Sequence, residues 1–174
     1  MDIGPYDALF PFTENSSRGT MAATPPTPYS CWVLPNKLLI GDAFTSESQA
    51  CATVRGADIG AVFCFSDDEV GHSEAKSLVG ADNFRYEPSR KDEDVLSAAK
   101  KAVEYVKAGK AVYAYDGEAA AVLAAVVAGQ LGKGSAEECV ALVNRSLRSR
   151  IARGGVSALS KRASDQIAKL LALH

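Results

Sequence analysis

The chain has 174 residues, of which 47% are apolar and 23% are charged, and its net charge at pH 7 is −2. These values are typical of one globular domain with a substantial core. They give no overall attraction to nucleic acid or to an anionic membrane, although contact with nucleic acid inside a ribonucleoprotein stays open. The most apolar run, Ala119 to Ala128, is far shorter than the roughly 20 residues of a membrane-spanning helix.

The cysteines and histidines do not form a metal-binding pattern. No two cysteines are arranged as C-x-x-C, and only His72 and His174 accompany them, which argues against a zinc site. The first residues lack the basic region and the apolar run of a secretory signal. We therefore expect a cytoplasmic protein, free or attached to a cytoskeletal or other large assembly, with reduced thiols and no metal or cofactor. The four cysteines are Cys31, Cys51, Cys64 and Cys139.

Residues 1–29 are predicted to be an extended, low-complexity tail. They hold five prolines and the turn-forming residues Gly4, Asn15-Ser16-Ser17 and Gly19, and show neither helical nor strand periodicity. One interpretation is a disordered leader. The other is a segment whose aromatic side chains bind a groove on a partner protein, with Tyr6, Phe10 and Phe12 as the anchors.

Residues 30–174 are predicted to form one domain in which strands and helices alternate. Apolar runs bounded by Gly, Pro or acidic residues predict strands, and apolar residues at helical spacing predict helices. Thr45 is expected to cap the first helix. Up to Gly109, we expect strands at 31–34, 37–41, 60–65 and 84–87, and helices at 46–55, 73–79 and 92–108.

The stretch from Ala111 to Leu131 is the centre of this pattern. It predicts a buried strand over 111–115, a tight turn at Asp116-Gly117-Glu118, and a helix with almost no polar residue. A capping box at Ser135–Glu138 then starts another helix, and a last helix covers about 159–171. The predicted fold is therefore a single α/β domain, with a mostly parallel central sheet flanked by helices.

This order of elements resembles the dual-specificity phosphatase branch of the protein tyrosine phosphatase family, over roughly residues 30–150. The similar stretches are Trp32–Gly41, Gly60–Phe65, Val112–Tyr115, Ala124–Ala128 and Ser135–Val140. The resemblance implies that the strand ending at Tyr115 leads into the H-C-x5-R signature of the family, with the apolar helix behind it.

The signature itself is absent. When the motif is carried over, Tyr115 stands at its His, Asp116 at its Cys and Val122 at its Arg. No Cys, His, Arg, Ser or Thr occurs from Ala111 to Leu131, so a shift of one residue restores nothing. The resemblance thus implies a phosphatase fold that has lost catalysis. The degenerate loop is Asp116, Gly117, Glu118 and Val122, and we expect its carboxylates to stabilise the helix N-terminus.

Four other residues resemble parts of a phosphatase site. Cys139 and Arg145 match C-x5-R, but they lie inside a predicted helix with an apolar interior and no glycine. Asp92 falls near the general-acid segment of the family and is better interpreted as a carboxylate at a helix start. Cys64 ends a predicted strand and is best interpreted as a buried thiol.

The C-terminal third carries a basic cluster that is either a solvated face or a docking surface for an acidic partner. Its members are Arg145, Arg148, Arg150, Arg153, Lys161 and Arg162.

The sequence favours a non-catalytic pseudophosphatase that is a structural or interaction component of a larger protein assembly. The alternative is a divergent phosphatase with an unrecognised nucleophile, or another activity in which Asp116 and Glu118 act as acid and base or bind a divalent cation. A third possibility is a module that binds phosphate without cleaving it.

Overall fold

A mostly parallel sheet of five strands forms the centre of the computed structural model, which describes residues 24–173. The strand order is β2-β3-β6-β4-β5, with β2 antiparallel to β3 and all other pairs parallel. The predicted α/β fold is confirmed. The strands are β2 (Ser30–Leu34), β3 (Leu38–Gly41), β4 (Ile59–Cys64), β5 (Phe84–Tyr86) and β6 (Ala111–Tyr115).

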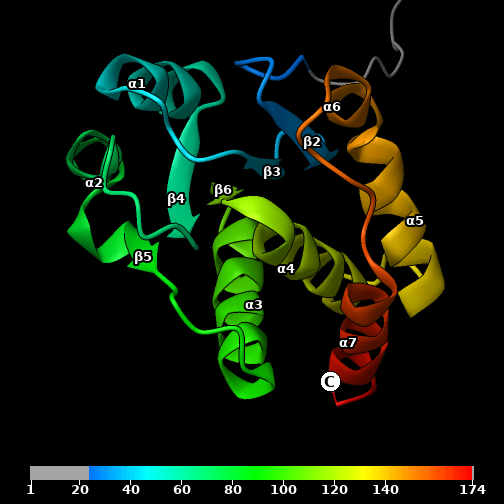
Figure 1. Ribbon diagram of the computed structural model, residues 1–174. Helices are drawn as coiled ribbons and strands as arrows, with labels where there is room; N and C mark the ends of the chain where they lie inside the picture. The colour runs from blue at the N-terminus through cyan, green and yellow to red at the C-terminus, as the bar shows by residue number, and fades with distance from the viewer. Residues whose placement is uncertain (1–23, 174) are drawn as a thin grey trace, which may run out of the picture.

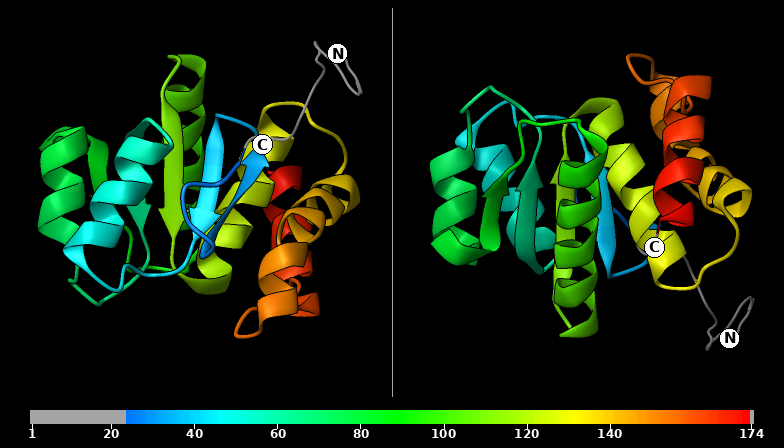
Figure 2. Two further views of the ribbon diagram at one scale, coloured as in Figure 1. Left: turned by 90° about the horizontal axis from the view of Figure 1, so that it is seen from above. Right: turned by 90° about the horizontal axis from the view of Figure 1, so that it is seen from below.

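Helices cover both faces of the sheet (Figure 1). Viewed from opposite sides in Figure 2, α1 and α2 lie on one face, and α3 and α4 lie on the other, where α5 and α7 pack outside α4. The helices are α1 (Glu47–Gly56), α2 (His72–Val79), η1 (Ala81–Asn83), α3 (Asp92–Lys107), α4 (Gly117–Gln130), α5 (Ala136–Ser146), α6 (Arg148–Arg153) and α7 (Lys161–Ala172).

One local prediction differs from the structure, and one short helix was not predicted. Ser46, rather than Thr45, caps α1, because the Ser46 hydroxyl accepts from the Gln49 N–H while the Thr45 hydroxyl donates to the Gln49 side chain. The short helix α6 was not predicted, since the chain continues in helical conformation through Leu147 after α5 ends. The predicted capping box at Ser135 and Glu138 is present.

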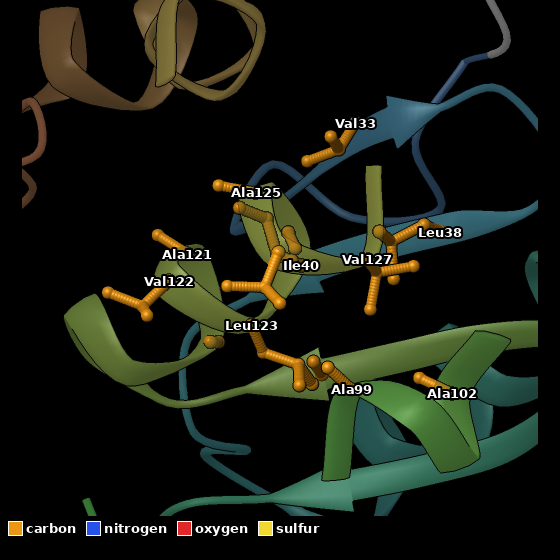
Figure 3. Close-up of a cluster of buried hydrophobic side chains, with 14 of the residues drawn as sticks. Val33, Leu38, Ile40, Ala99, Ala102, Ala121, Val122, Leu123, Ala125 and Val127 are labelled. Carbon is orange, nitrogen blue, oxygen red and sulfur yellow. The ribbon is translucent and has the colours of Figure 1, made fainter. Parts of the chain in front are cut away.

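Helix α4 is buried on all sides. Every residue from Ala120 to Ala128 is buried, and Figure 3 shows Leu123 and Val127 among side chains from the sheet and from α3. A helix that is apolar around its whole circumference is stable only where neighbours enclose it. Here the sheet, α3, α5 and α7 do so, which fixes the position of the α4 N-terminus.

The described part of the predicted tail packs on the domain. The Trp32 indole donates to the Thr24 carbonyl at 3.3 Å, and the Asp42 N–H donates to the Tyr29 carbonyl at 3.1 Å. Ser30, the expected start of the domain, begins β2. Residues 1–23, with Tyr6, Phe10 and Phe12, lie outside the described residues. Among residues 24–173, no helix has the length and apolar character required to cross a membrane.

The enclosure of α4 predicts a large cost for truncating its core side chains. Leu123 is 0% exposed, so Leu123→Ala is expected to lower the free energy of unfolding by about 2–5 kcal/mol through lost burial and a residual cavity. The control is Leu173→Ala at the exposed end of α7, expected to change it by less than about 0.5 kcal/mol. Urea unfolding followed by circular dichroism measures both, and equal costs would contradict the packing described.

Candidate functional site

The candidate site lies where the parallel strands end and α4 begins. Because β6 is the middle strand, its last residue opens onto the centre of this edge, with β3 and β4 on either side. A single residue, Asp116, joins β6 to α4, which starts at Gly117. An H-C-x5-R signature needs a loop that wraps an oxyanion between strand and helix. This junction has no room for one.

Asp116 occupies the N-cap position, yet its side chain makes no capping hydrogen bond. Its backbone is extended, as an N-cap requires, but Gly117 has a φ of +66°, outside the right-handed helical region. Since Gly117 follows at once, the N–H groups of the first turn are not arranged around the Asp116 carboxylate in the usual way. Asp116 therefore does not stabilise the α4 N-terminus through a side-chain capping hydrogen bond.

Glu118 instead connects two helix starts. One carboxylate oxygen accepts from the Ser160 N–H at 2.9 Å, and the other accepts from the Ser160 hydroxyl at 3.2 Å. Ser160 is itself the N-cap of α7, where its hydroxyl accepts from the Ala163 N–H at 3.1 Å. The negative charge of Glu118 thus lies near the positive ends of both α4 and α7.

Two cavities flank this contact, and Glu118 lines both. The smaller has a volume of about 200 Å³ and lies beside Asp42, Asp116 and Arg150. The larger, about 720 Å³, lies between the starts of α3, α4 and α7 and is lined by Asp92 and Val122, among others. The Glu118–Ser160 contact therefore stands between two spaces at the end of the sheet.

Val122 leaves the position of the signature arginine without a donor. It lies in the second turn of α4 and is buried against the core, at the edge of the larger cavity. An arginine recognises phosphate through a guanidinium fork that matches the oxygens of the ligand. An isopropyl group cannot supply that contact.

Asp92 starts α3, as predicted. Its carboxylate lies 2.7 Å from the Lys169 ammonium and accepts from the Gln166 amide at 3.1 Å. These hydrogen bonds, from Lys169 first and from Gln166, lower the pKa of Asp92. A carboxyl group with a lowered pKa is ionised at neutral pH and has no proton to donate, so this arrangement does not suit a general acid.

Arg150 corrects the prediction of a basic docking surface. Arg145 and Arg148 are exposed, but Arg150 is only 6% exposed and so cannot belong to an open face. Its guanidinium lies 2.5 Å from the Asp42 carboxylate, and its Nε has no hydrogen-bond partner in the described part of the chain. The burial of Arg150 could have been predicted from its helical spacing. One buried helical stripe contains Cys139, Val143, Leu147 and Arg150.

Two cysteines are placed as the sequence predicted. Cys139 is buried inside α5, so Cys139 and Arg145 form no phosphate-binding loop. Cys64 is fully buried at the end of β4, and burial raises the pKa of its thiol. Sequence reasoning missed that its sulfur lies 3.2 Å from Nε2 of His72, because a loop of seven residues separates the two and no pattern links them.

A search for metal ligands among residues 24–173 finds no group of three His, Cys, Asp or Glu side chains that could hold an ion. Asp116 and Glu118 are close in sequence, but Glu118 is engaged by Ser160. The described residues thus offer no built cation site at this edge of the sheet.

Comparison with solved structures identifies the class of fold. PTPMT1 in complex with PI(5)P matches with a TM-score of 0.65 and 12% identity, over 83% of this chain and 96% of that one. The PTP-2 phosphatase of Cydia pomonella gives 0.61 and 13%, over 82% and 90%. Tk-PTP in the active form gives 0.60 and 15%, over 83% and 96%. The domain therefore has a protein tyrosine phosphatase-like fold.

The likeness is one of structure alone. No family model matches the chain, and no curated protein matches it in sequence. At identities of 12–15%, the solved structures establish the fold and leave activity to be argued from the residues of the site.

The lowered pKa of Asp92 predicts a pH dependence of stability. A carboxyl group whose pKa is lower in the folded state adds stability above its unfolded pKa of about 3.9, and this stability is lost as the pH falls through the folded value. Asp92→Asn should therefore reduce stability at neutral pH and flatten its decline below about pH 4. The control is Asp165→Asn, which removes an exposed pair with Lys161. Thermal unfolding across pH compares them, and identical profiles would contradict the role of Asp92.

Burial of Arg150 predicts that the arginines of α6 differ in their structural role. Arg150→Ala leaves Asp42 without its cation and is expected to cost about 2 kcal/mol or more, below the value for a fully buried pair because Asp42 keeps contact with water. Arg148→Ala should change the free energy of unfolding by less than about 0.5 kcal/mol. Chemical denaturation measures both, and a neutral Arg150→Ala would show that the ion pair does not stabilise the fold.

Proposed function

We propose that this chain is a non-catalytic, phosphatase-like protein that serves as a structural or interaction component of a larger protein assembly. The observation that carries the proposal is the start of α4, where Asp116 directly follows β6 and Glu118 is bonded to the cap of α7. Carboxylates thus occupy the region in which a phosphate group would bind.

The chemistry of phosphate cleavage supports this proposal. It requires a nucleophile, a cationic fork for the oxygens and an acid for the leaving group. Asp116 and Val122 stand at the positions of the nucleophile and of the cationic fork, and their side chains supply neither group. Asp92 is held as a carboxylate, so it does not supply the acid. Two unit charges of the same sign 4 Å apart repel by about 4 kcal/mol at an effective dielectric constant of 20, so a phosphate dianion meets a considerable penalty beside Asp116.

Partner binding is proposed from the sequence and from exposure. The aromatic anchors Tyr6, Phe10 and Phe12 stay a prediction, because the tail that contains them lies outside the described residues. Arg145 and Arg148 are exposed and fit a docking role. A domain that keeps a rigid phosphatase-like core without its chemistry presents these surfaces in fixed positions.

The alternative, a divergent phosphatase with an unrecognised nucleophile, is favoured by one observation. Cys64 and His72 are close enough for a thiol and an imidazole to form a nucleophile–base pair. Against it, Cys64 is fully buried, its pKa is raised, and it lines neither of the cavities at the edge of the sheet. A buried, protonated thiol is a poor nucleophile.

An activity assay tests the proposal. The full chain is expected to show no turnover of an aryl phosphate above the buffer rate, because no cysteine lines either cavity at the start of α4 and the nearby Arg150 guanidinium is paired with Asp42. Calorimetry with inorganic phosphate should show no binding. The matched variant Cys64→Ser should leave both results unchanged.

Turnover by the natural chain that disappears in Cys64→Ser would overturn the proposal and establish the alternative. Phosphate binding without turnover would instead support the module that binds phosphate. Asp116→Ser probes that case, since removing the nearest carboxylate should strengthen any such binding.

A further inference from the structure

Charge is divided unevenly between two ends of the molecule. Residues 58–82, which include α2 and the loop before it, carry six carboxylates and one lysine. Residues 145–169, from the end of α5 into α7, carry seven cationic side chains and one carboxylate. Figures 1 and 2 show α2 at one end of the molecule, and α5 and α6 at the other. The near-neutral total therefore conceals an uneven distribution of charge between these two segments.

The acidic end combines charge with exposed apolar surface. We define it as Asp67, Asp68, Glu69, Val70 and Tyr86. The first four lie in the loop between β4 and α2, and Tyr86 ends β5. All five are exposed, Val70 at 41% and Tyr86 at 49%. The Tyr86 hydroxyl donates to Asp67, which holds the aromatic ring beside the acidic loop. Exposed large apolar side chains within a charged patch are typical of interaction surfaces.

The other end of the molecule, which we call the basic end, combines positive charge with an exposed aromatic side chain. We define it as Arg145, Arg148, Arg153 and Tyr29, all exposed, with Tyr29 at 50%. Arg153 donates to the Pro28 carbonyl at 2.8 Å, which places Tyr29 close to Arg153. Within residues 24–173, Arg145 and Arg148 make no ion pair. Tyrosine and arginine are the residue types enriched at protein interfaces.

We propose that copies of this chain associate head to tail, with the acidic end of one copy against the basic end of the next. Opposite charges, and tyrosines that offer their faces to arginine guanidinium groups, make the two ends complementary. Such a contact joins two different surfaces, so it continues into a chain of copies or closes into a ring. A second copy of the chain is a protein partner, as the proposed interaction role requires. Self-association does not depend on whether the chain is catalytic.

The physical properties of this contact follow from its residues. Exposed ion pairs contribute roughly 0–1 kcal/mol each and are screened beyond about 8 Å at physiological ionic strength. Val70 and the two tyrosines add apolar burial that salt does not screen. Association should therefore be weak, depend on concentration and decrease with salt.

Sedimentation velocity of the full chain at increasing concentration and low salt tests the proposal. The mean mass is expected to grow beyond two copies and to fall as salt is added. The acidic-end variant is Asp68→Lys with Glu69→Lys, and the basic-end variant is Arg145→Gln with Arg148→Gln. Each alone should stay monomeric. Their mixture keeps one intact pair of ends and should form one-to-one dimers that grow no further.

The control is Lys100→Gln with Lys107→Gln on α3, which removes the same charge as the basic-end variant from exposed positions and should assemble like the natural chain. A natural chain that stays monomeric, or variants whose mixture stays monomeric, would overturn the proposal. A closed dimer that neither variant disturbs would also overturn it. So would oligonucleotide binding by the basic end without self-association. None of these outcomes bears on the phosphatase assay, so the two proposals fail independently.

Discussion

The enclosure of α4 is the constraint on which the rest of the structure depends. Because its apolar surface extends around the whole helix, α4 has to lie between the sheet and the outer helices, directly after the middle strand. Its N-terminus then points into the end of the sheet with unpaired N–H groups and a partial positive charge. A negative group is stabilised at this position, although water can also pair the N–H groups.

In this chain the compensating charge comes from the protein itself. Glu118 accepts two hydrogen bonds from Ser160, which lies 42 residues further on and begins α7. One carboxylate thereby compensates two helix ends and holds α7 against α4. Arg150 acts in a related way on the other side, as a buried cation that pairs with Asp42 after β3. The edge of the sheet is thus held by interactions among the chain's own groups.

The sequence predicts those features that depend on neighbours along the chain. The period of apolar residues predicts β6 and α4, and the spacing of Ser135 and Glu138 predicts a cap, because the atoms involved belong to one helical turn. The side-chain geometry of Asp116 was not predictable in this way, since it depends on the conformation that Gly117 adopts between strand and helix. The contacts of Glu118 with Ser160 and of Cys64 with His72 join separate elements, so their existence depends on tertiary packing. Arg150 is intermediate, because its place on an apolar stripe is visible in the sequence while its partner Asp42 is not.

The fold and the chemistry of a phosphatase can separate because they depend on different groups. The core consists of apolar side chains on α3, α4 and the sheet, and none of these needs a thiolate or a guanidinium nearby. The non-catalytic role that we propose would place the function of the domain on its surface. The uneven distribution of exposed charge between α2 and α5–α6 is what such a surface offers, since rigid ends of opposite sign set the orientation as well as the strength of a contact.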